Sequence, residues 1–209
     1  MIPAIMLVCG LLVLFGIMFL VLKIYSQIRL NKLLHSKKIG TKETSSALLL
    51  QFGWNNVFID SAMRHRNSPN RTKYFFDNII VRKNGIFFVT TCPVKGKIIA
   101  NDSNIWHQTY RTDYRIIEND FTSPVADAER KLPILYEIAD EIQLNRKYIV
   151  SYVCMSSPAA AMNIFVENVY NLPDTIEYIY SRKLKKNLTL KQRNMFKREL
   201  KKRIKENRI

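Results

Sequence analysis

The sequence contains little cysteine, histidine, glycine or proline. Its 209 residues include three cysteines with no Cys-x-x-Cys pair, and three histidines that lie far apart. This spacing argues against a zinc site and a disulfide framework, and it is typical of scattered reduced thiols. With 47% hydrophobic and 11% aromatic residues, and few Gly and Pro, the composition is that of a folded protein. The length suits one ordinary domain with appendages.

Charge is missing from the first part of the chain. The 21 residues of Ile2–Leu22 carry none, and as a helix they span about the 30 Å of a bilayer core at about 1.5 Å per residue. A cleaved signal peptide is the alternative, but it requires a basic start, a shorter apolar run and a small-residue cleavage site, none of which is present. We therefore expect residues 1–22 to form an uncleaved transmembrane anchor.

Basic residues follow the apolar run and none precedes it. Residues 23–38 contain five Lys or Arg and no acid, so we expect a basic juxtamembrane linker. By the positive-inside rule this asymmetry places the N-terminus outside the cell membrane and the rest of a single-pass protein in the cytoplasm.

The net charge of +16 is unevenly distributed. Residues 39–181 carry 15 basic and 15 acidic side chains, so this segment is neutral, whereas residues 182–209 carry 13 basic side chains and two acidic ones. We predict a neutral folded domain over 39–181 and a basic helical tail over 182–209. The domain itself does not have the charge of a basic nucleic-acid binder.

Hydrophobic periodicity and turn signals predict an α/β fold, a mixed sheet flanked by helices. A polar loop is expected between residues 100 and 123, and Pro133 is expected to kink or split the helix around it. The expected elements are a helix from Gly40, a strand at Val57–Ile59, a hairpin of Tyr74–Val81 and Ile86–Thr91 extended by Gly96–Ala100, a helix over 123–142, and a strand over 147–155.

The tail begins with a capping box at Thr189 and Gln192, and a narrow apolar stripe runs along it. This pattern fits a solvated helix that packs one edge on its own domain, and it also fits attachment to anionic lipid headgroups or to nucleic-acid phosphate. The candidate contacts for such a polyanion are Lys185, Lys186, Arg193, Lys197, Arg198, Lys201, Lys202 and Arg203.

One carboxylate, Asp77, lies inside an apolar strand, where an ionised group is costly unless it is paired. Residues 40 to about 135 resemble the nuclease-related domain (NERD), a family of the restriction-endonuclease-like superfamily. The resemblance rests on Glu43 with Ala47 and Leu50 in the first helix, on Asp77 in "FFDN", on "GIFFVTTCPVKGKI", on Trp106-x-Gln108, and on Ser123-Pro124.

The resemblance implies a divalent-metal site. In that superfamily an Asp and the Glu of a Glu-x-Lys motif hold Mg²⁺ or Mn²⁺, and the Lys activates or orients water. A strand places residues two apart on one face, toward the Asp. Here Thr90 stands at the Glu position and Cys92 at the Lys position. Thr90 is a poor magnesium ligand, and Cys92 is a soft one that is mostly neutral near pH 7.

Glu43, Asp77, Thr90 and Cys92 are therefore interpreted as a vestigial site, with Asp77 and Glu43 as metal ligands only if activity remains. A rebuilt site would need Lys95 or Lys97 as its lysine. Asp60 or Glu118 would then lend it a carboxylate. The alternatives are ordinary exposed lysines, an Asp77 bonded to backbone amides or to Lys73, a Glu43 that stabilises the start of its helix, and a Trp106 that anchors the core.

The expected function is that of a membrane-anchored NERD-like domain that has lost metal-dependent cleavage and needs no cofactor. It would act by binding nucleic acid or a protein partner. The first alternative is an active nuclease that uses Mg²⁺ or Mn²⁺ at a rearranged site. The second is a structural protein of the membrane surface that binds anionic lipid. The resemblance to the family suggests nuclease activity, but Thr90 and Cys92 at the Glu-x-Lys positions argue against it.

Overall fold

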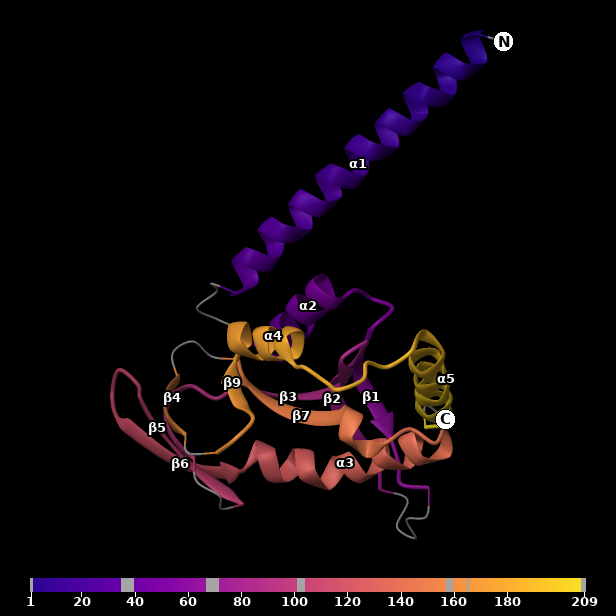
Figure 1. Ribbon diagram of the computed structural model, residues 1–209. Coiled ribbons are helices and arrows are strands. Elements are labelled where there is room, and N and C mark those ends of the chain that lie inside the picture. Colours follow the sequence, from indigo (N-terminus) through magenta and orange to yellow (C-terminus); the bar gives the residue numbers. More distant parts are fainter. Residues whose placement is uncertain are drawn as a thin grey trace.

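The computed structural model describes residues 2–34, 40–66, 72–100, 104–156, 160–164 and 166–207. A long helix projects from a body in which helices cover both faces of a mixed sheet (Figure 1). The helices are α1 (Ile2–Leu34), α2 (Thr41–Phe52), α3 (Pro124–Glu141), the 3₁₀ turn η1 (Arg146–Tyr148), α4 (Leu172–Ser181) and α5 (Leu190–Glu206). The strands are β1 (Val57–Met63), β2 (Tyr74–Arg82), β3 (Gly85–Cys92), β4 (Gly96–Ala100), β5 (Ile105–Arg111), β6 (Ile116–Thr122), β7 (Ile149–Met155), β8 (Ala160–Ile164) and β9 (Val169–Asn171).

The main sheet has the strand order β1-β2-β3-β7-β9. Its first three strands are antiparallel, and β7 and β9 join them in parallel. Every residue of β3 is buried, because it is the central strand and is covered on both faces. The chain returns from β3 to the parallel neighbour β7 through α3, as a parallel connection requires. The predicted mixed sheet with flanking helices is confirmed.

The β2–β3 hairpin forms where the sequence predicts it. Arg82 pairs with Gly85 across a two-residue turn at Lys83 and Asn84. The side chain of Asn84 donates to the carbonyl of Ile179, with an N–O distance of 2.6 Å, and so fastens the turn to the end of α4. Gly85 has a φ of +147°, and a Cβ there would meet the guanidinium of Arg182. These contacts fix the register of the strand that carries Asp77.

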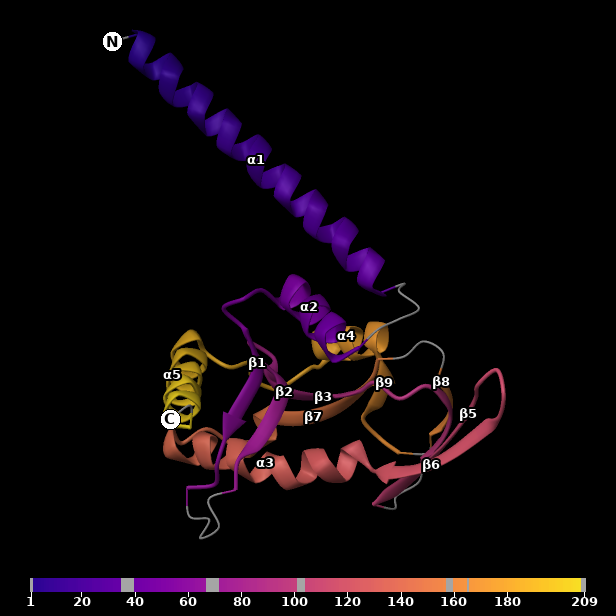
Figure 2. The same ribbon diagram turned by 180° about the vertical axis from the view of Figure 1, so that it is seen from behind.

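Helices lie on both faces of the main sheet (Figure 2), and each face has its own hydrophobic core. On one face α3 and α5 cover Ile79, Ile86 and Phe88, and on the other α2 and α4 cover Ile80, Phe87 and Val89. The end of α1 belongs to the second core, because Leu30 is 4% exposed there. α1 is therefore held against the domain by packing. Its basic residues up to Lys32 lie on the helix itself.

A second sheet, of order β6-β5-β4-β8, corrects two predictions. β4 does not extend the β2–β3 hairpin, because Pro93 and the positive φ of Gly96 (+83°) turn the chain away. The segment expected as a polar loop forms β5 and β6. Most side chains of this hairpin are exposed, and Trp106 is its one fully buried residue, so the segment lacks the alternation that marks a half-buried strand.

Helix α3 is not split at Pro133, although a split is one of the two predicted effects of this proline. It is one continuous helix with Pro133 inside it. Pro133 and Glu129, whose carbonyl loses its helical partner, are both exposed. Solvent can therefore satisfy the freed carbonyl, which removes much of the usual reason for a helix to break at proline.

Candidate functional site

Asp77 lies in β2 with its side chain turned toward α3. Its Oδ2 accepts a hydrogen bond from the backbone N–H of Thr91, at 2.6 Å. Burial raises the pKa of Asp77 above its ordinary value, and the Thr91 amide and the positive charge of Lys131 oppose this rise. The carboxylate is thus bonded to a backbone amide, as one of the predicted alternatives requires, and it also lines an open pocket.

The pocket has a volume of about 420 Å³ and lies between the ends of β2 and β3 and the first turns of α3. Thr90 and Cys92 line it together with Asp77, so the period of two in β3 places both on the expected face. Burial raises the pKa of Cys92 to about 11, which keeps its thiol neutral near pH 7. The hydroxyl oxygen of Thr90 is buried and has no hydrogen-bond partner within the part of the chain described.

Three charged residues from α3 complete the pocket. Asp127 and Lys131, four residues apart on the helix, form an ion pair, and both line the pocket with Arg130. The Lys131 side chain is only 12% exposed. The negative charge of Asp127 raises the pKa of Asp77, whereas Lys131 lowers it. The site therefore combines two coupled carboxylates with a lysine that the sequence analysis did not select.

Comparison of the sequence with models of known protein families identifies the family of this chain. Residues 36–156, more than half of the chain, match the family model described as nuclease-related domain, NERD. The chain belongs to this family. No curated protein and no solved structure matched in the same comparisons. The resemblance inferred from the sequence motifs is confirmed, and the match extends to the end of β7, so that α4 and α5 lie beyond it.

The remaining candidate residues of the NERD domain lie outside the Asp77 pocket. Glu43 sits in the first turn of α2, where its Oε2 accepts a hydrogen bond from the Gly40 N–H at 3.0 Å, and so it stabilises the helix start. Lys95 and Lys97 are exposed side chains on the approach to β4 and on β4 itself, as the plainer reading expected. The structure does not bring Glu43, Lys95 or Lys97 into the pocket.

Two further predictions near the pocket have mixed outcomes. Asp60 is exposed on β1, and its charge contributes to the raised pKa of Asp77, but the residue does not line the pocket. Glu118 lies exposed on β6. Trp106 is fully buried in the core that joins the two sheets, with its ring edge toward Phe121. It is the core anchor that one reading of the sequence proposed.

The donor set of the pocket does not fit a resident magnesium ion. One oxygen of Asp77 accepts from the Thr91 amide, and Asp127 is neutralised by Lys131. Cys92 offers a neutral soft sulfur, which magnesium does not favour. Within the described ranges, no three His, Cys, Asp or Glu side chains are grouped so that they could hold a metal ion. The charges of the pocket are instead balanced between two acids and two bases.

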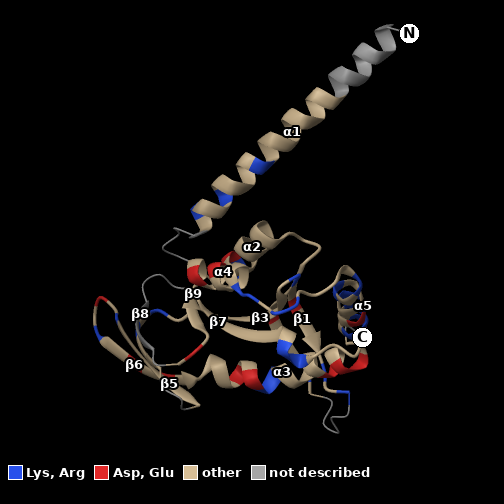
Figure 3. Cartoon of the chain, viewed as in Figure 1, with Lys and Arg blue, Asp and Glu red and all other residues tan. Residues whose placement is uncertain are grey.

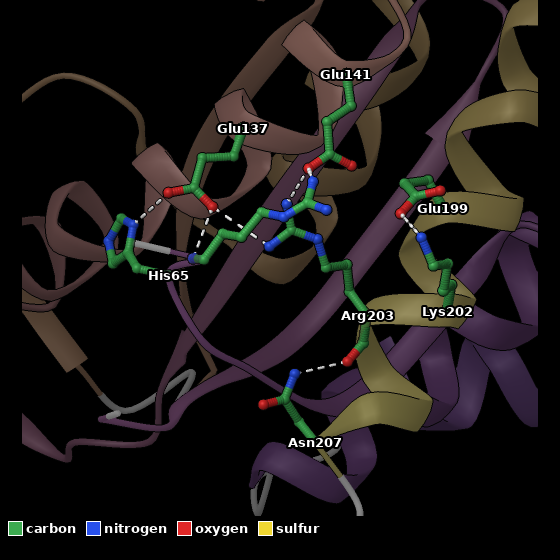
Figure 4. Close-up of polar contacts among 8 residues, drawn as sticks. His65, Glu137, Glu141, Glu199, Lys202, Arg203 and Asn207 are labelled. Carbon is green, nitrogen blue, oxygen red and sulfur yellow. Dashed lines mark hydrogen bonds and ion pairs between the residues drawn. The ribbon is translucent and has the colours of Figure 1, made fainter. Parts of the chain in front are cut away.

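One residue of the predicted polyanion-binding set, Arg203, has a different role. Figure 4 shows its guanidinium reaching from α5 to Glu137 and Glu141 of α3. The side chain is 6% exposed, and its Nη1 lies 3.4 Å from Glu137 Oε2. His65 and Arg66 approach the same two carboxylates. Arg203 is therefore a buried partner inside the domain and is not presented to a polyanion.

The other predicted cations of α5 differ in their surroundings. Lys197 donates to Asn56 at 2.7 Å, and burial, followed by the charges of Arg193 and Lys201, lowers its pKa. Lys202 pairs with Glu199 on its own helix. Figure 3 shows Lys and Arg gathered on α5. The exposed members of the predicted set are Lys185, Lys186, Arg198, Lys201 and Lys202.

Proposed function

We propose that this chain is a single-pass membrane protein whose NERD domain lies in the cytoplasm and binds nucleic acid without metal-dependent cleavage. One observation carries the loss of cleavage. Thr90 and Cys92 occupy the two positions of the family's Glu-x-Lys pair, both face the pocket of Asp77, and both are uncharged. The groups that hold a metal and activate water in related nucleases are therefore replaced at their own positions.

The anchor is supported by α1. Among the residues described, one helix is long and apolar enough to cross a membrane, over Leu12–Leu33 with a mean hydropathy of 1.7. The residues of this helix from Leu12 to Tyr25 are all exposed, and only its domain end, at Leu30, is buried against the rest of the protein, so the apolar side chains before it are left for another apolar environment. The basic residues Lys23, Arg29 and Lys32 lie toward the domain end of α1, which supports the cytoplasmic placement of the domain.

Nucleic-acid binding is supported by the family and by the pocket. The guanidinium of Arg130 and the ammonium of Lys131 stand at the pocket, and both are donors suited to a backbone phosphate. A phosphate would compete with Asp127 for Lys131.

A second candidate function rests on a different observation in the same pocket. Asp127 supplies a second carboxylate beside Asp77, and Lys131 supplies a lysine, so the charged groups lost from β3 have counterparts on α3. An active nuclease with a rearranged site would use these three residues with Mg²⁺ or Mn²⁺. Lys95, Lys97 and Glu118, which the sequence suggested for a rearranged site, would not take part in this one.

The test uses the full chain in detergent with single- and double-stranded DNA and RNA. Binding and cleavage are measured without metal, with Mg²⁺ and with Mn²⁺, for the wild type, Asp77→Ala, Lys131→Gln and a Lys191→Gln control. We expect binding that weakens with salt and is reduced by Lys131→Gln, with intact substrate under every condition. Lys191→Gln, at an exposed lysine outside the pocket and outside the predicted polyanion-binding set, should leave this binding close to wild type.

Cleavage that needs the metal, Asp77 and Lys131 together would refute the proposal and establish the second candidate. Absence of binding to every nucleic acid would also refute it. The remaining class of partner for the NERD domain would then be another protein.

A further inference from the structure

A groove lies between β1 and α5, away from the Asp77 pocket. Its volume is about 400 Å³, within the range of small-molecule sites. It is lined by Phe58, Ile59 and Ser61 of β1 and by Lys201, Ile204 and Lys205 of α5. Figure 1 shows that α5 packs at one side of the domain, whereas the first turns of α3 and β6 lie at the other. The groove and the pocket are therefore separate sites.

The charge of the groove is positive. Lys201 and Lys205 lie one turn apart and are exposed, and none of the described lining residues is acidic. Neither lysine forms an ion pair within the described part of the chain. The pKa of the neighbouring Lys197 reflects the positive charge in this region, because burial and then the charges of Arg193 and Lys201 lower it. An anionic group at the groove would meet two unopposed ammonium groups.

The wall of the groove below these lysines is apolar. Phe58, Ile59 and Ile204 are half-buried, so each keeps part of its hydrocarbon surface exposed to solvent. A phosphate at the lysines would leave this surface wet, whereas an amphiphile would cover it with its hydrocarbon part. The combination of apolar wall and cationic rim therefore fits an anionic head joined to an apolar chain.

The position of the domain relative to α1 identifies the source of such a molecule. Leu30 of α1 is buried in the domain, so the domain is packed directly against the helix. The helical segment from Lys23 to Leu34 is about 18 Å long at about 1.5 Å per residue. With α1 inserted in a bilayer, the domain stands close to the lipid headgroups, and α1 leans over the side of the domain that carries α5 (Figure 1).

We propose that the groove between β1 and α5 binds an anionic phospholipid of the membrane that α1 enters, with the phosphate at Lys201 and Lys205 and the upper acyl chain on Phe58, Ile59 and Ile204. This proposal rests on the membrane-anchor part of the proposed function. It does not depend on the Asp77 pocket. The groove would hold the domain in one orientation against the membrane surface.

The experiment is native mass spectrometry of the full chain in a neutral detergent. Phosphatidylglycerol, phosphatidylcholine and glycerol 3-phosphate are titrated separately. The variants are Lys201→Gln with Lys205→Gln, a matched control of Lys183→Gln with Lys191→Gln, two exposed lysines outside the groove and outside the predicted polyanion-binding set, and Ile204→Asn for the apolar wall. Nucleic-acid binding is measured on the same samples, so that a failure of the pocket and a failure of the groove give different results.

We expect one phosphatidylglycerol to bind in preference to phosphatidylcholine and to glycerol 3-phosphate. The groove double variant should weaken this binding roughly 25-fold, at about fivefold for each lysine, and Ile204→Asn should weaken it as well. The control double variant should bind phosphatidylglycerol as the wild type does. Nucleic-acid binding at the pocket should stay unchanged in all the variants.

Equal losses in the two double variants would overturn the proposal, because they would show a diffuse charge effect. Absence of a preference for phosphatidylglycerol would also overturn it. If the groove variant instead abolished DNA binding and left lipid binding intact, the groove would be a phosphate site for nucleic acid.

Discussion

At the scale of single residues, the charges of this NERD domain are used mainly between neighbouring elements. Asp77 joins β2 to the backbone of β3, the Asp127–Lys131 pair faces it from α3, and Arg203 joins α5 to α3. Each of these groups is at least partly withdrawn from water, so each affects both stability and function. Changes at these positions should therefore have larger effects than changes at the exposed lysines.

Asp77→Asn should stabilise the protein near neutral pH. Burial raises the pKa of Asp77 in the fold above its ordinary value. The folded state therefore holds the proton more tightly than the unfolded chain, and the wild type loses stability as pH rises through the folded pKa. Asparagine removes this loss and keeps an acceptor for the Thr91 N–H.

The measurement is the melting temperature of wild type and Asp77→Asn between pH 3 and pH 8. The advantage of the variant should be small below the ordinary Asp pKa of about 3.9, should grow through the raised pKa, and should then become constant. A variant that melts below the wild type at neutral pH would show that the attraction of Lys131 outweighs the burial of the carboxylate.

Arg203→Gln should destabilise the protein by about 2 kcal/mol or more, because it leaves Glu137 and Glu141 facing each other without the buried guanidinium. Burial alone would raise the pKa of both carboxyls, but their hydrogen bonds and the neighbouring positive charges lower it below the usual value. The stability that they contribute is present above the unfolded pKa and is lost as pH falls. The variant should therefore show a weaker decline of stability toward acid.

Chemical denaturation at pH 7 and at pH 4 measures this effect. The exposed Arg198 on the same helix provides the control, since Arg198→Gln should change the free energy of unfolding by no more than about 0.5 kcal/mol. If the two variants were equally stable, the contact of Arg203 with Glu137 and Glu141 would not stabilise the fold, and Arg203 would again be a candidate contact for a polyanion.

At the scale of elements, the sequence predicts the strands that are apolar and the helices that have an apolar stripe along one face. The hairpin of β2 and β3 follows from its apolar runs and its Lys-Asn-Gly turn, and α5 follows from the capping box at Thr189. The second sheet could not be predicted in the same way, because β5 and β6 expose most of their side chains. Their pairing is a consequence of tertiary structure that local periodicity does not record.

The candidate site divides in the same way. Asp77, Thr90 and Cys92 could be placed together because a strand has a period of two and the hairpin register follows from its turn. Asp127 and Lys131 reach the pocket from a helix whose position is set by the β3–α3–β7 connection. A pair of opposite charges four residues apart is common on solvated helices. The one feature of the sequence that distinguishes the Asp127–Lys131 pair is its position in the first turns after Ser123-Pro124.

Gly96→Ala tests the element that redirects the chain from one sheet to the other. The φ of Gly96 is +83°, and a Cβ there would overlap the backbone carbonyl of Thr109 on β5. We expect a loss of about 1–3 kcal/mol in the free energy of unfolding. Hydrogen exchange should show the loss of protection first in β4 and β5.

Lys97→Ala, at an exposed position on the same strand, is the control and should leave this exchange unchanged. If Gly96→Ala kept the protection of β4 and β5, the close approach to Thr109 would not govern the path of the chain.

At the scale of the whole molecule, the uneven charge of the sequence corresponds to a division of surfaces. The neutral segment 39–181 forms most of the folded body, and the basic residues lie at the domain end of α1 and on α5 (Figure 3). α5 is not separate from that body, because Phe196 and Leu200 lie in the same core as Ile79 and Phe88. The positive surface is thereby fixed in position relative to the Asp77 pocket and to α1.

The last prediction concerns topology. The basic residues that follow the apolar run predict that a tag at the C-terminus is cytoplasmic and a tag at the N-terminus is outside. In inside-out vesicles, protease should therefore remove the C-terminal tag and spare the N-terminal one, and right-side-out vesicles should give the opposite result. Substituting Lys23, Arg29 and Lys32 by Gln, with two lysines added before Ile2, should invert a measurable fraction of the molecules. If the original chain showed its C-terminal tag on the outside, the NERD domain could not meet nucleic acid in the cytoplasm. The proposed function would then fail at its first step.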